Sequence, residues 1–569
     1  MAVTYLRFAL LSGLLKSRTM RFSQQYVLLI FITLVIATVT VQSAAAQNLS
    51  STAYNVRSYG AKGDGQTLDT AAINKTIDAA AAAGGGTVYF PAGDYLSTSI
   101  RLKSNIALYL DQGATIIAAE TSATAKYDAP EPNQWDAYQD FGHSHWHNSL
   151  IWGENLENVS ITGPGRIWGR GLVRLGSQSR TAEQNAALAN VPGESRAGPY
   201  GFPSPRDAVE VGWGNKAIAL KLCRNVIIRD VTILHGGHFA ILVTGVDNLT
   251  IDNLKIDTNR DGIDIDACKN VRVSNTMVNS PIDDGICPKS SYALGYARAT
   301  ENLTITNCQV SGYLEGTLLD GTYKREPQRT TGDFSSPMGR IKFGTESNGG
   351  FKNITISNCV FDYSRGLALE SVDGAILEDV TVTNITMREI SNAPIFMRLG
   401  FRGRGPKDKT TIGVLRRITI SNVVVYNAGA GMSSIIAGVP GHPIEDITLS
   451  NIRVYTIGGG TAAQAARELP EKEDAYPEPT MFGDTPSYGF FIRHAKGLRI
   501  HDVAVTYLKD DARPAFVLDD VDGIEISHIK PQTAAGASTF LLKDVRDFGL
   551  HASYPLADKR IDSIKLGKL

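Results

Sequence analysis

The stretch DTNRDGIDIDACKNVRVSNTMVNSPIDDGICPKS, residues 257–290, decides the predicted fold of this chain. It contains two acidic clusters, at residues 261–264 (DGID) and at residues 283–285 (DDG). The spacing from Asp261 to Asp283 is 22 residues. This is about one coil of a parallel β-solenoid, whose repeats start near 20 residues. The stretch therefore predicts two neighbouring coils with acidic side chains at corresponding positions.

A short alternating run of β-branched residues, bounded by Asn or Asp, recurs along the rest of the chain. The runs lie at residues 106–109, 159–162, 225–230, 248–253, 270–275, 302–307, 353–358, 379–384, 417–422, 446–451, 498–502 and 524–527. Such runs are typical of short strands. The helices of a βαβ fold are missing, and a β-propeller would require longer blades. The pattern predicts an all-β fold, a single right-handed parallel β-helix over residues 47–569, in which long gaps between runs are loop insertions.

Two further features fit a β-helix. Residues 71–83 (AAINKTIDAAAAA) predict a helix, with Asp69 or Thr70 at its start and Gly84 after its end. This helix would cap the open N-terminal end of the solenoid. The Asn residues that recur at the runs are expected to stack inside the turns and to bridge coils through their amides.

The N-terminus predicts an export signal at residues 1–46. Four cations and no acid precede or flank an apolar run at residues 26–41, and Ala44-Ala45-Ala46 resembles a small-residue cleavage site. A retained membrane anchor is the alternative, although the run is near the lower limit for a span. We expect an exported protein, periplasmic or extracellular, that has no membrane contact after cleavage.

Composition excludes several classes of function. The chain has 569 residues, 43% hydrophobic and 20% charged, with a formal net charge of -1, which gives no indication of nucleic-acid binding. Its five cysteines are too few and too scattered for a disulfide scaffold, and no CxxC predicts structural zinc. We expect the cysteines to be small core residues, and we expect no cofactor or metal.

Stacking of neighbouring coils, about 4.8 Å apart, would bring Asp261, Asp264, Asp283 and Asp284 onto one surface. Carboxylates this close repel each other, so their pKa values separate, and one stays protonated while another stays ionised. Two carboxyl groups in different protonation states are what glycoside hydrolysis requires. The alternative is that each cluster is an ordinary solvated turn, because Asp and Gly are common turn residues.

Insertions are expected to border this acidic surface. Residues 127–147 contain aromatic side chains and the sequence His143-Ser144-His145-Trp146-His147, and residues 400–409 (GFRGRGPKDK) are strongly basic. Together they would form a groove in which aromatic rings stack on sugars and cations pair with acidic substituents. The alternatives are a solvated basic loop and, for the alternating histidines, a metal site.

Two motifs resemble glycoside hydrolase family 28, the polygalacturonase family of the pectate-lyase-like superfamily. They are NRDGIDID at residues 259–266 and SPIDDGICPKS at residues 280–290, and the opening residues 55–93 also resemble the superfamily. The resemblance implies an inverting glycosidase on a parallel β-helix. It implies that Asp283 is the general acid and that Asp261 and Asp284 activate water, with carboxyl groups about 6.5–9.5 Å apart.

The family's two later motifs are not matched. Gly-His-Gly falls at residues 338–340 (MGR), and Arg-Ile-Lys falls at residues 368–370 (ALE). Arg340 or Lys342 could take the place of the missing histidine, and Glu370 would repel a uronate unless a cation neutralises it. A rhamnogalacturonan-type or other decorated plant-wall polysaccharide is therefore an equal candidate to simple homogalacturonan. The side chains expected to contact the polysaccharide or oligosaccharide are Asp264, Lys289, Arg340, Lys342, Glu370, Arg398 and Arg402.

Two other functions remain open on the same fold. One is a polysaccharide lyase with Ca²⁺ held by Asp261, Asp264 and Asp266, because calcium prefers such oxygen clusters. The other is a non-catalytic carbohydrate-binding or adhesion module, which would tolerate replacement of Asp283.

Overall fold

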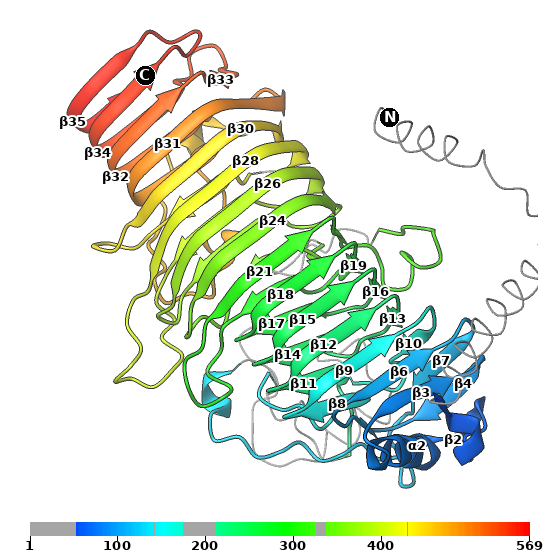
Figure 1. Cartoon of the computed structure of the whole chain (residues 1–569). Helices are drawn as coiled ribbons and strands as arrows, with labels where there is room; N and C mark the ends of the chain where they lie inside the picture. The colour runs from blue at the N-terminus through cyan, green and yellow to red at the C-terminus, as the bar shows by residue number, and fades with distance from the viewer. Residues whose placement is uncertain (1–52, 140–142, 174–211, 326–336, 430) are drawn as a thin grey trace, which may run out of the picture. The chain divides into compact units, whose positions relative to one another are not determined.

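A computed structural model describes residues 53–139, 143–173, 212–325, 337–429 and 431–569. The predicted export signal at residues 1–46 lies outside the described residues, so it stays a prediction. Residues 54–569 make one compact unit, in which strands stack coil upon coil (Figure 1). None of the helices in the described ranges has the length and apolarity needed to span a membrane.

The strands pair in parallel with the strands one coil before and after them. For example, β12 (Arg224–Arg229), β15 (Asp247–Asp252) and β18 (Lys269–Ser274) are consecutive neighbours in parallel register. Leu249 of β15 lies between Val226 of β12 and Val271 of β18. This arrangement confirms the predicted right-handed parallel β-helix.

The strands of the first coils are β1 (Ala53–Asn55), β2 (Asp64–Leu68), β3 (Gly86–Phe90), β4 (Gly93–Ser97), β5 (Ile100–Arg101), β6 (Ile106–Leu110), β7 (Ala114–Ala118), β8 (Ile151–Glu154), β9 (Glu157–Thr162) and β10 (Arg166–Trp168). The middle coils add β11 (Lys216–Lys221), β13 (Thr232–Leu234), β14 (Phe239–Thr244), β16 (Lys255–Asp257), β17 (Asp261–Asp266), β19 (Met277–Asn279), β20 (Ile286–Lys289), β21 (Thr300–Thr306), β22 (Gln309–Ser311) and β23 (Lys342–Phe343). The last coils contain β24 (Phe351–Asp362), β25 (Leu367–Ser371), β26 (Ile376–Ile390), β27 (Ile395–Leu399), β28 (Val414–Ala428), β29 (Ser434–Ala437), β30 (Ile444–Gly458), β31 (Phe490–Lys509), β32 (Phe516–Ser527), β33 (Lys530–Pro531), β34 (Phe540–His551) and β35 (Lys559–Lys568).

Both ends of the described coil stack are capped. The predicted N-terminal helix is present as α2 (Thr70–Ala82), which buries Ile73 and Ile77 against the first coils. Asp69 precedes the helix but does not cap it through its side chain, since its carboxylate accepts hydrogen bonds from the backbone of residues 62 and 63. At the other end, β35 pairs with β34 in antiparallel fashion and so ends the parallel stacking.

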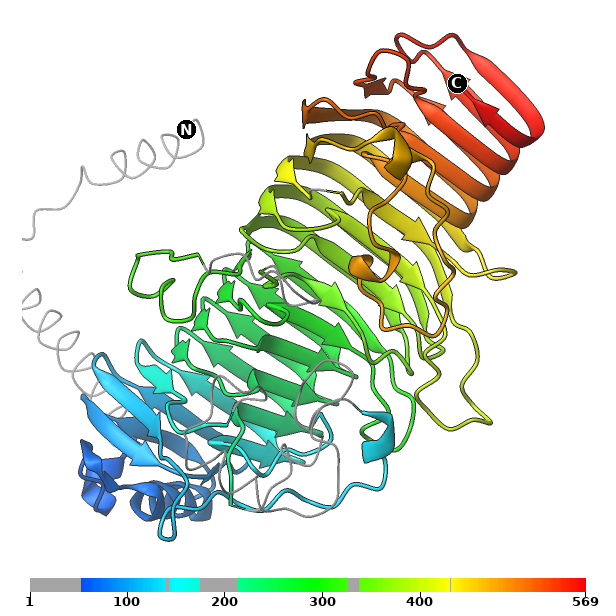
Figure 2. The same ribbon diagram turned by 180° about the vertical axis from the view of Figure 1, so that it is seen from behind.

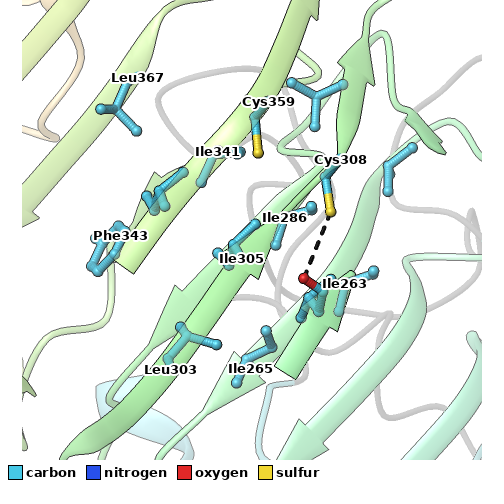
Figure 3. Close-up of a cluster of buried hydrophobic side chains, with 14 of the residues drawn as sticks. Ile263, Ile265, Ile286, Leu303, Ile305, Cys308, Ile341, Phe343, Cys359 and Leu367 are labelled. Atoms are coloured by element: carbon cyan, nitrogen blue, oxygen red, sulfur yellow. Dashed lines mark hydrogen bonds between the residues drawn. The ribbon is translucent and has the colours of Figure 1, made fainter. Parts of the chain in front are cut away.

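The interior of the coils is filled by aliphatic side chains that repeat from coil to coil. Figure 3 shows part of it, where Ile263, Ile286 and Ile341 come from successive coils. All five cysteines are buried and free, as predicted, and Cys308 and Cys359 lie within this core. Burial of such surface stabilises a fold by roughly 25 cal/mol per Å².

The recurring Asn side chains form ladders along the outside of the β-helix. Asn270 donates to Asn248 at 3.2 Å and accepts from Asn302 at 2.9 Å, and all three have φ near +55°. Asn is among the few residues that adopt this left-handed conformation readily. The predicted bridging is therefore confirmed, but the ladders are exposed rather than internal, because the turns point their side chains outward.

The long connection between β30 and β31 runs across the neighbouring coils. It includes α4 (Ala462–Ala465) and the short helix η4 (Pro479–Phe482), and in Figure 2 it is the gold and orange segment beside the yellow and green strands. Two short helices lie elsewhere in the loops, η1 (Val56–Tyr59) and η2 (Asp136–Tyr138). The connection after β30 matters for the site, because Tyr476 and Glu478 reach residues that precede them by more than a hundred positions.

Candidate active site

The two acidic clusters lie on adjacent strands of a separate sheet, whose order among the described strands is β20-β17-β14-β11-β8-β5. Ile263 of β17 pairs with Ile286 of β20, and Gly262 N donates to Asp284 O at 3.0 Å. The register therefore places Asp284 beside Asp261, one residue later than the 22-residue spacing suggests. A Cβ on Gly262 would meet Gly285 O at 2.4 Å, so only glycine allows this close approach of the two coils.

Three carboxylates meet at this point. One oxygen from each of Asp261, Asp283 and Asp284 lies within 4.8 Å of the other two. The nearest oxygens are therefore closer than the roughly 6.5–9.5 Å that separates carboxyl groups in typical inverting glycosidases. This short separation differs from the one that the family resemblance implies.

Asp284 is held ionised by two cations from the next coil. Arg340 Nε donates to its Oδ1 at 2.8 Å, and Lys342 Nζ lies 3.3 Å from its Oδ2. Burial alone would raise the pKa of Asp284, but the charges of Lys342 and Arg340 outweigh burial and lower this pKa to about 2.

Asp261 is in the opposite electrostatic state. It is buried, and its Oδ1 has no hydrogen-bond partner. Burial, followed by repulsion from Asp264 and Asp283, raises the pKa of Asp261 well above its ordinary value. The pKa values of Asp261 and Asp284 are therefore shifted in opposite directions, as is expected for neighbouring carboxyls in different surroundings.

Asp283 is the most accessible of the three, with 15% of its side chain exposed against 3% for Asp284. Arg260 forms an ion pair with its Oδ2, and the backbone N–H of Asp284 donates to its Oδ1 at 3.1 Å. Of the three carboxylates, Asp283 is therefore the one most open to solvent.

A second charged group lies on the same face of β17. Ile263 and Ile265 point into the core, so Asp264 points the other way. Lys289 Nζ is 3.5 Å from Asp264 Oδ2 and 3.2 Å from Glu346 Oε2. The structure thus brings Asp264 and Lys289 next to the three carboxylates, as predicted.

His143 completes this second group from a distant part of the chain. Its Nε2 lies 3.1 Å from Asp264 Oδ2, and its Nδ1 lies 3.8 Å from Glu346 Oε1. Sequence analysis considered His143 only as a possible metal ligand with His145 and His147. Those two histidines instead contact Asp136 and Glu154, away from Asp264.

A third group surrounds Arg340 and Lys342. Both nitrogens of the Arg340 guanidinium fork contact the carboxylate of Glu478, which also pairs with Arg365. Lys342 Nζ donates to Tyr476 Oη at 3.2 Å and lies 3.9 Å from Glu370 Oε2. Sequence reasoning missed Tyr476 and Glu478, because nothing in the local pattern shows that their loop returns to the site.

Glu370 is fully buried, and neither of its carboxylate oxygens has a hydrogen-bond partner. Burial raises the pKa of Glu370 to about 8, although Lys342 and Arg340 oppose the shift. The carboxyl is therefore protonated at neutral pH.

The guanidinium groups of the other two predicted substrate contacts bind other groups of the protein. Arg398 donates to the backbone carbonyls of residues 438, 471 and 472, and Arg402 forms an ion pair with Asp373 at 2.6 Å. Both side chains are thus engaged within the protein. Trp146 of the aromatic insertion is fully buried and donates to Thr244, so it is not available to stack on a sugar.

Within the part of the chain that the structure describes, two sets of side chains have the geometry to hold a cation. They are His143 with Asp261 and Asp264, and Asp261 with Asp283 and Asp284. The ammonium of Lys289 beside Asp264 disfavours a cation in the first set. The calcium set considered from the sequence is not assembled, because Ser291 donates to both oxygens of Asp266.

Comparison with known proteins finds a matching family model and several related sequences. A family model described as "Rhamnogalacturonase A/epimerase, pectate lyase-like" matches residues 53–285. An exo-poly-alpha-D-galacturonosidase of Dickeya chrysanthemi is 24% identical over 411 residues, which cover 66% of this chain and 62% of the relative. A probable polygalacturonase of Vitis vinifera is 24% identical over 420 residues, which cover 68% of this chain and 71% of the relative.

The chain resembles the polygalacturonase family, glycoside hydrolase family 28. Among solved structures, the family 28 exopolygalacturonase of Yersinia enterocolitica superposes with a TM-score of 0.60 at 19% identity. That superposition covers 85% of this chain and 79% of the Yersinia chain, and at this identity it shows the fold. The match to the Dickeya relative spans less than two thirds of that protein's length.

Proposed function

We propose that this chain is an exported, polygalacturonase-like glycoside hydrolase that cleaves a pectin-type or other plant-wall polysaccharide with inversion. The proposal rests on one observation. Oxygens of Asp261, Asp283 and Asp284 lie within 4.8 Å of one another, while the pKa of Asp261 is raised and the pKa of Asp284 is lowered. Glycosidic bonds are cleaved by a protonated carboxyl together with an ionised one.

In the proposed reaction, Asp284 accepts a proton from the attacking water, because Lys342 and Arg340 keep it ionised. The water oxygen bonds to the anomeric carbon as the bond from that carbon to the glycosidic oxygen breaks. Asp283, the most exposed carboxyl, gives its proton to the leaving oxygen. The raised pKa of Asp261 supports a cluster that retains one proton at neutral pH. Interacting carboxyls share such a proton, so Asp283 can carry it when the substrate is bound.

The decisive experiment measures products from a panel of plant-wall polysaccharides with the wild type, Asp283→Asn and Asp284→Asn. We expect new reducing ends without ultraviolet-absorbing products, and a fall of about 10²–10⁴-fold in either variant. Asp230→Asn is a matched control, because Asp230 lies on the outer ladder with φ of 69°, where Asn is well tolerated. Full activity in Asp283→Asn would contradict the proposed acid.

A second measurement tests inversion. Proton NMR during the first turnovers shows the anomeric configuration of the product before it equilibrates in water. The inverted anomer is expected. The retained anomer would fit the short separation of the carboxylates and would make one of them a nucleophile.

A polysaccharide lyase is the second candidate, since the carboxylates can also hold a cation. It predicts unsaturated products that absorb ultraviolet light and that disappear when a chelator is added. Hydrolysis that survives the chelator would exclude it.

A further inference from the structure

The cations that act on the three carboxylates are all paired with carboxylates of the protein itself. Arg260 contacts Asp283, and Lys289 lies between Asp264 and Glu346. Arg340 and Lys342 share Asp284, and each has a second carboxylate partner, Glu478 or Glu370.

Protein carboxyls outnumber cations around this point. Arg260, Lys289, Arg340, Lys342 and Arg365 face seven carboxyls, those of Asp261, Asp264, Asp283, Asp284, Glu346, Glu370 and Glu478. His143 also contacts two of these carboxyls, with its Nε2 3.1 Å from Asp264 Oδ2 and its Nδ1 3.8 Å from Glu346 Oε1. Each of these cations therefore already has a carboxylate partner within the protein before any substrate enters.

We propose that the sugar bound beside Asp284 carries no free carboxylate, so that this site selects a neutral or esterified residue over a uronate. This inference deepens the proposed hydrolase function and rests on it. A uronate would bring an extra negative charge next to Asp284 and Glu478 and would have to take Arg340 or Lys342 from them. Leaving a buried carboxylate unpaired in that way is costly, so the uronate is disfavoured.

The experiment compares three preparations of one polymer, of which one is charged and two are neutral. Polygalacturonic acid is assayed beside the same polymer after methyl esterification, and beside a third preparation in which the carboxyls are reduced to primary alcohols. The wild type is expected to show kcat/KM higher by about tenfold or more on the two neutral polymers.

A variant tests the role of the ion pair between Arg340 and Glu478. Glu478→Gln removes the second partner of Arg340 while keeping the shape of the side chain, and so leaves a surplus positive charge. The ratio of neutral to charged polymer rates should fall at least about threefold. Glu301→Gln is the control, because Glu301 pairs with Lys269 and Lys352 on β21 and should leave the ratio unchanged. A ratio measured within one preparation does not depend on how much of a variant folds.

The outcomes separate this inference from the proposed function. Faster or equal cleavage of polygalacturonic acid would overturn the inference while leaving the hydrolase intact. If none of the three preparations is cut, the protein is tested on other glycans. Asp283-dependent hydrolysis of an uncharged glycan would support the inference, whereas Asp283-dependent hydrolysis of a uronate glycan would overturn it. Absence of hydrolysis on every glycan would contradict both the inference and the proposed hydrolase function.

Discussion

Arg340 Nε donates to Asp284 Oδ1 at 2.8 Å, which links two neighbouring coils at the point where the proposed base lies. Both residues are buried, with Arg340 1% and Asp284 2% exposed. Gly285 N and Ile286 N also bond to the backbone oxygen of Arg340, so the pair is fixed through main chain and side chain. The ionisation of Asp284 thus depends on a residue one coil away.

Replacing Arg340 should move the pH dependence of activity. Arg340→Met removes a charge that favours the ionised form of Asp284, so the pKa of Asp284 rises from about 2. The acidic limb of kcat/KM should shift to higher pH by about one unit, whereas Arg340→Lys should shift less. The measurement is kcat/KM from about pH 1.5 to pH 8, so that a limb near pH 2 lies inside the range. The proposal would be contradicted by an unmoved acidic limb in a folded Arg340→Met protein.

Arg513→Met is the matched control for that experiment. Arg513 is a buried arginine that pairs with Asp511 at 2.7 Å, at coils remote in sequence from the carboxylates. Breaking this pair should lower the melting temperature, because a buried charge loses its partner. It should leave the acidic limb in place.

His143 should position Asp264 rather than act on the substrate. His143→Gln removes the contact at 3.1 Å and should lower kcat by about tenfold, since a buried hydrogen bond to a charged group contributes about 1.5–3 kcal/mol. His145→Gln is the control from the same sequence motif, because His145 contacts Asp136 instead. Equal loss of activity in both variants would indicate a general effect of the loop.

Glu370 should make the protein less stable as pH rises. Its pKa is about 8 in the folded protein and 4.5 without the fold, so between these values the folded state holds a proton that the unfolded state has lost. The free energy of unfolding therefore falls as pH rises from 4.5 to 8 and levels off above. Glu370→Gln should remove this trend. Its melting temperature relative to the wild type should be higher at pH 8 than at pH 5 by about 2 °C or more.

The outer Asn ladder should respond to substitution in a fixed order. Asn270 has φ of 56° and bonds to Asn248 and Asn302. Asn270→Gly loses the hydrogen bonds, but glycine adopts this positive φ without strain. Asn270→Ala loses the same hydrogen bonds and also strains the backbone by about 1–2 kcal/mol. Thermal unfolding should therefore rank the wild type above the Gly variant and the Gly variant above the Ala variant. A more stable Ala variant would contradict this account of the ladder.

Local patterns predicted the β-helix, the capping helix and the buried cysteines, since each depends on residues close in sequence. Asp261, Asp283 and Asp284 were also identifiable, because one coil separates them. The structure stacks Asp284 rather than Asp283 on Asp261, which the spacing alone does not decide. Arg398 and Arg402 were predicted to contact substrate, yet their guanidinium groups are engaged by backbone carbonyls and by Asp373. Whether substrate reaches them stays a prediction.

The sequence by itself determined the coil repeat and the acidic cluster, because a solenoid converts a period along the chain directly into neighbours in space. Only the tertiary structure decided the charge balance of the site. His143, Tyr476 and Glu478 come from loops whose paths no local pattern encodes, and they reach Asp264, Lys342 and Arg340 across more than a hundred residues. Burial then set the protonation of Asp261 and Glu370, since a carboxyl loses the solvation of its charged form only once the surrounding chain has closed over it.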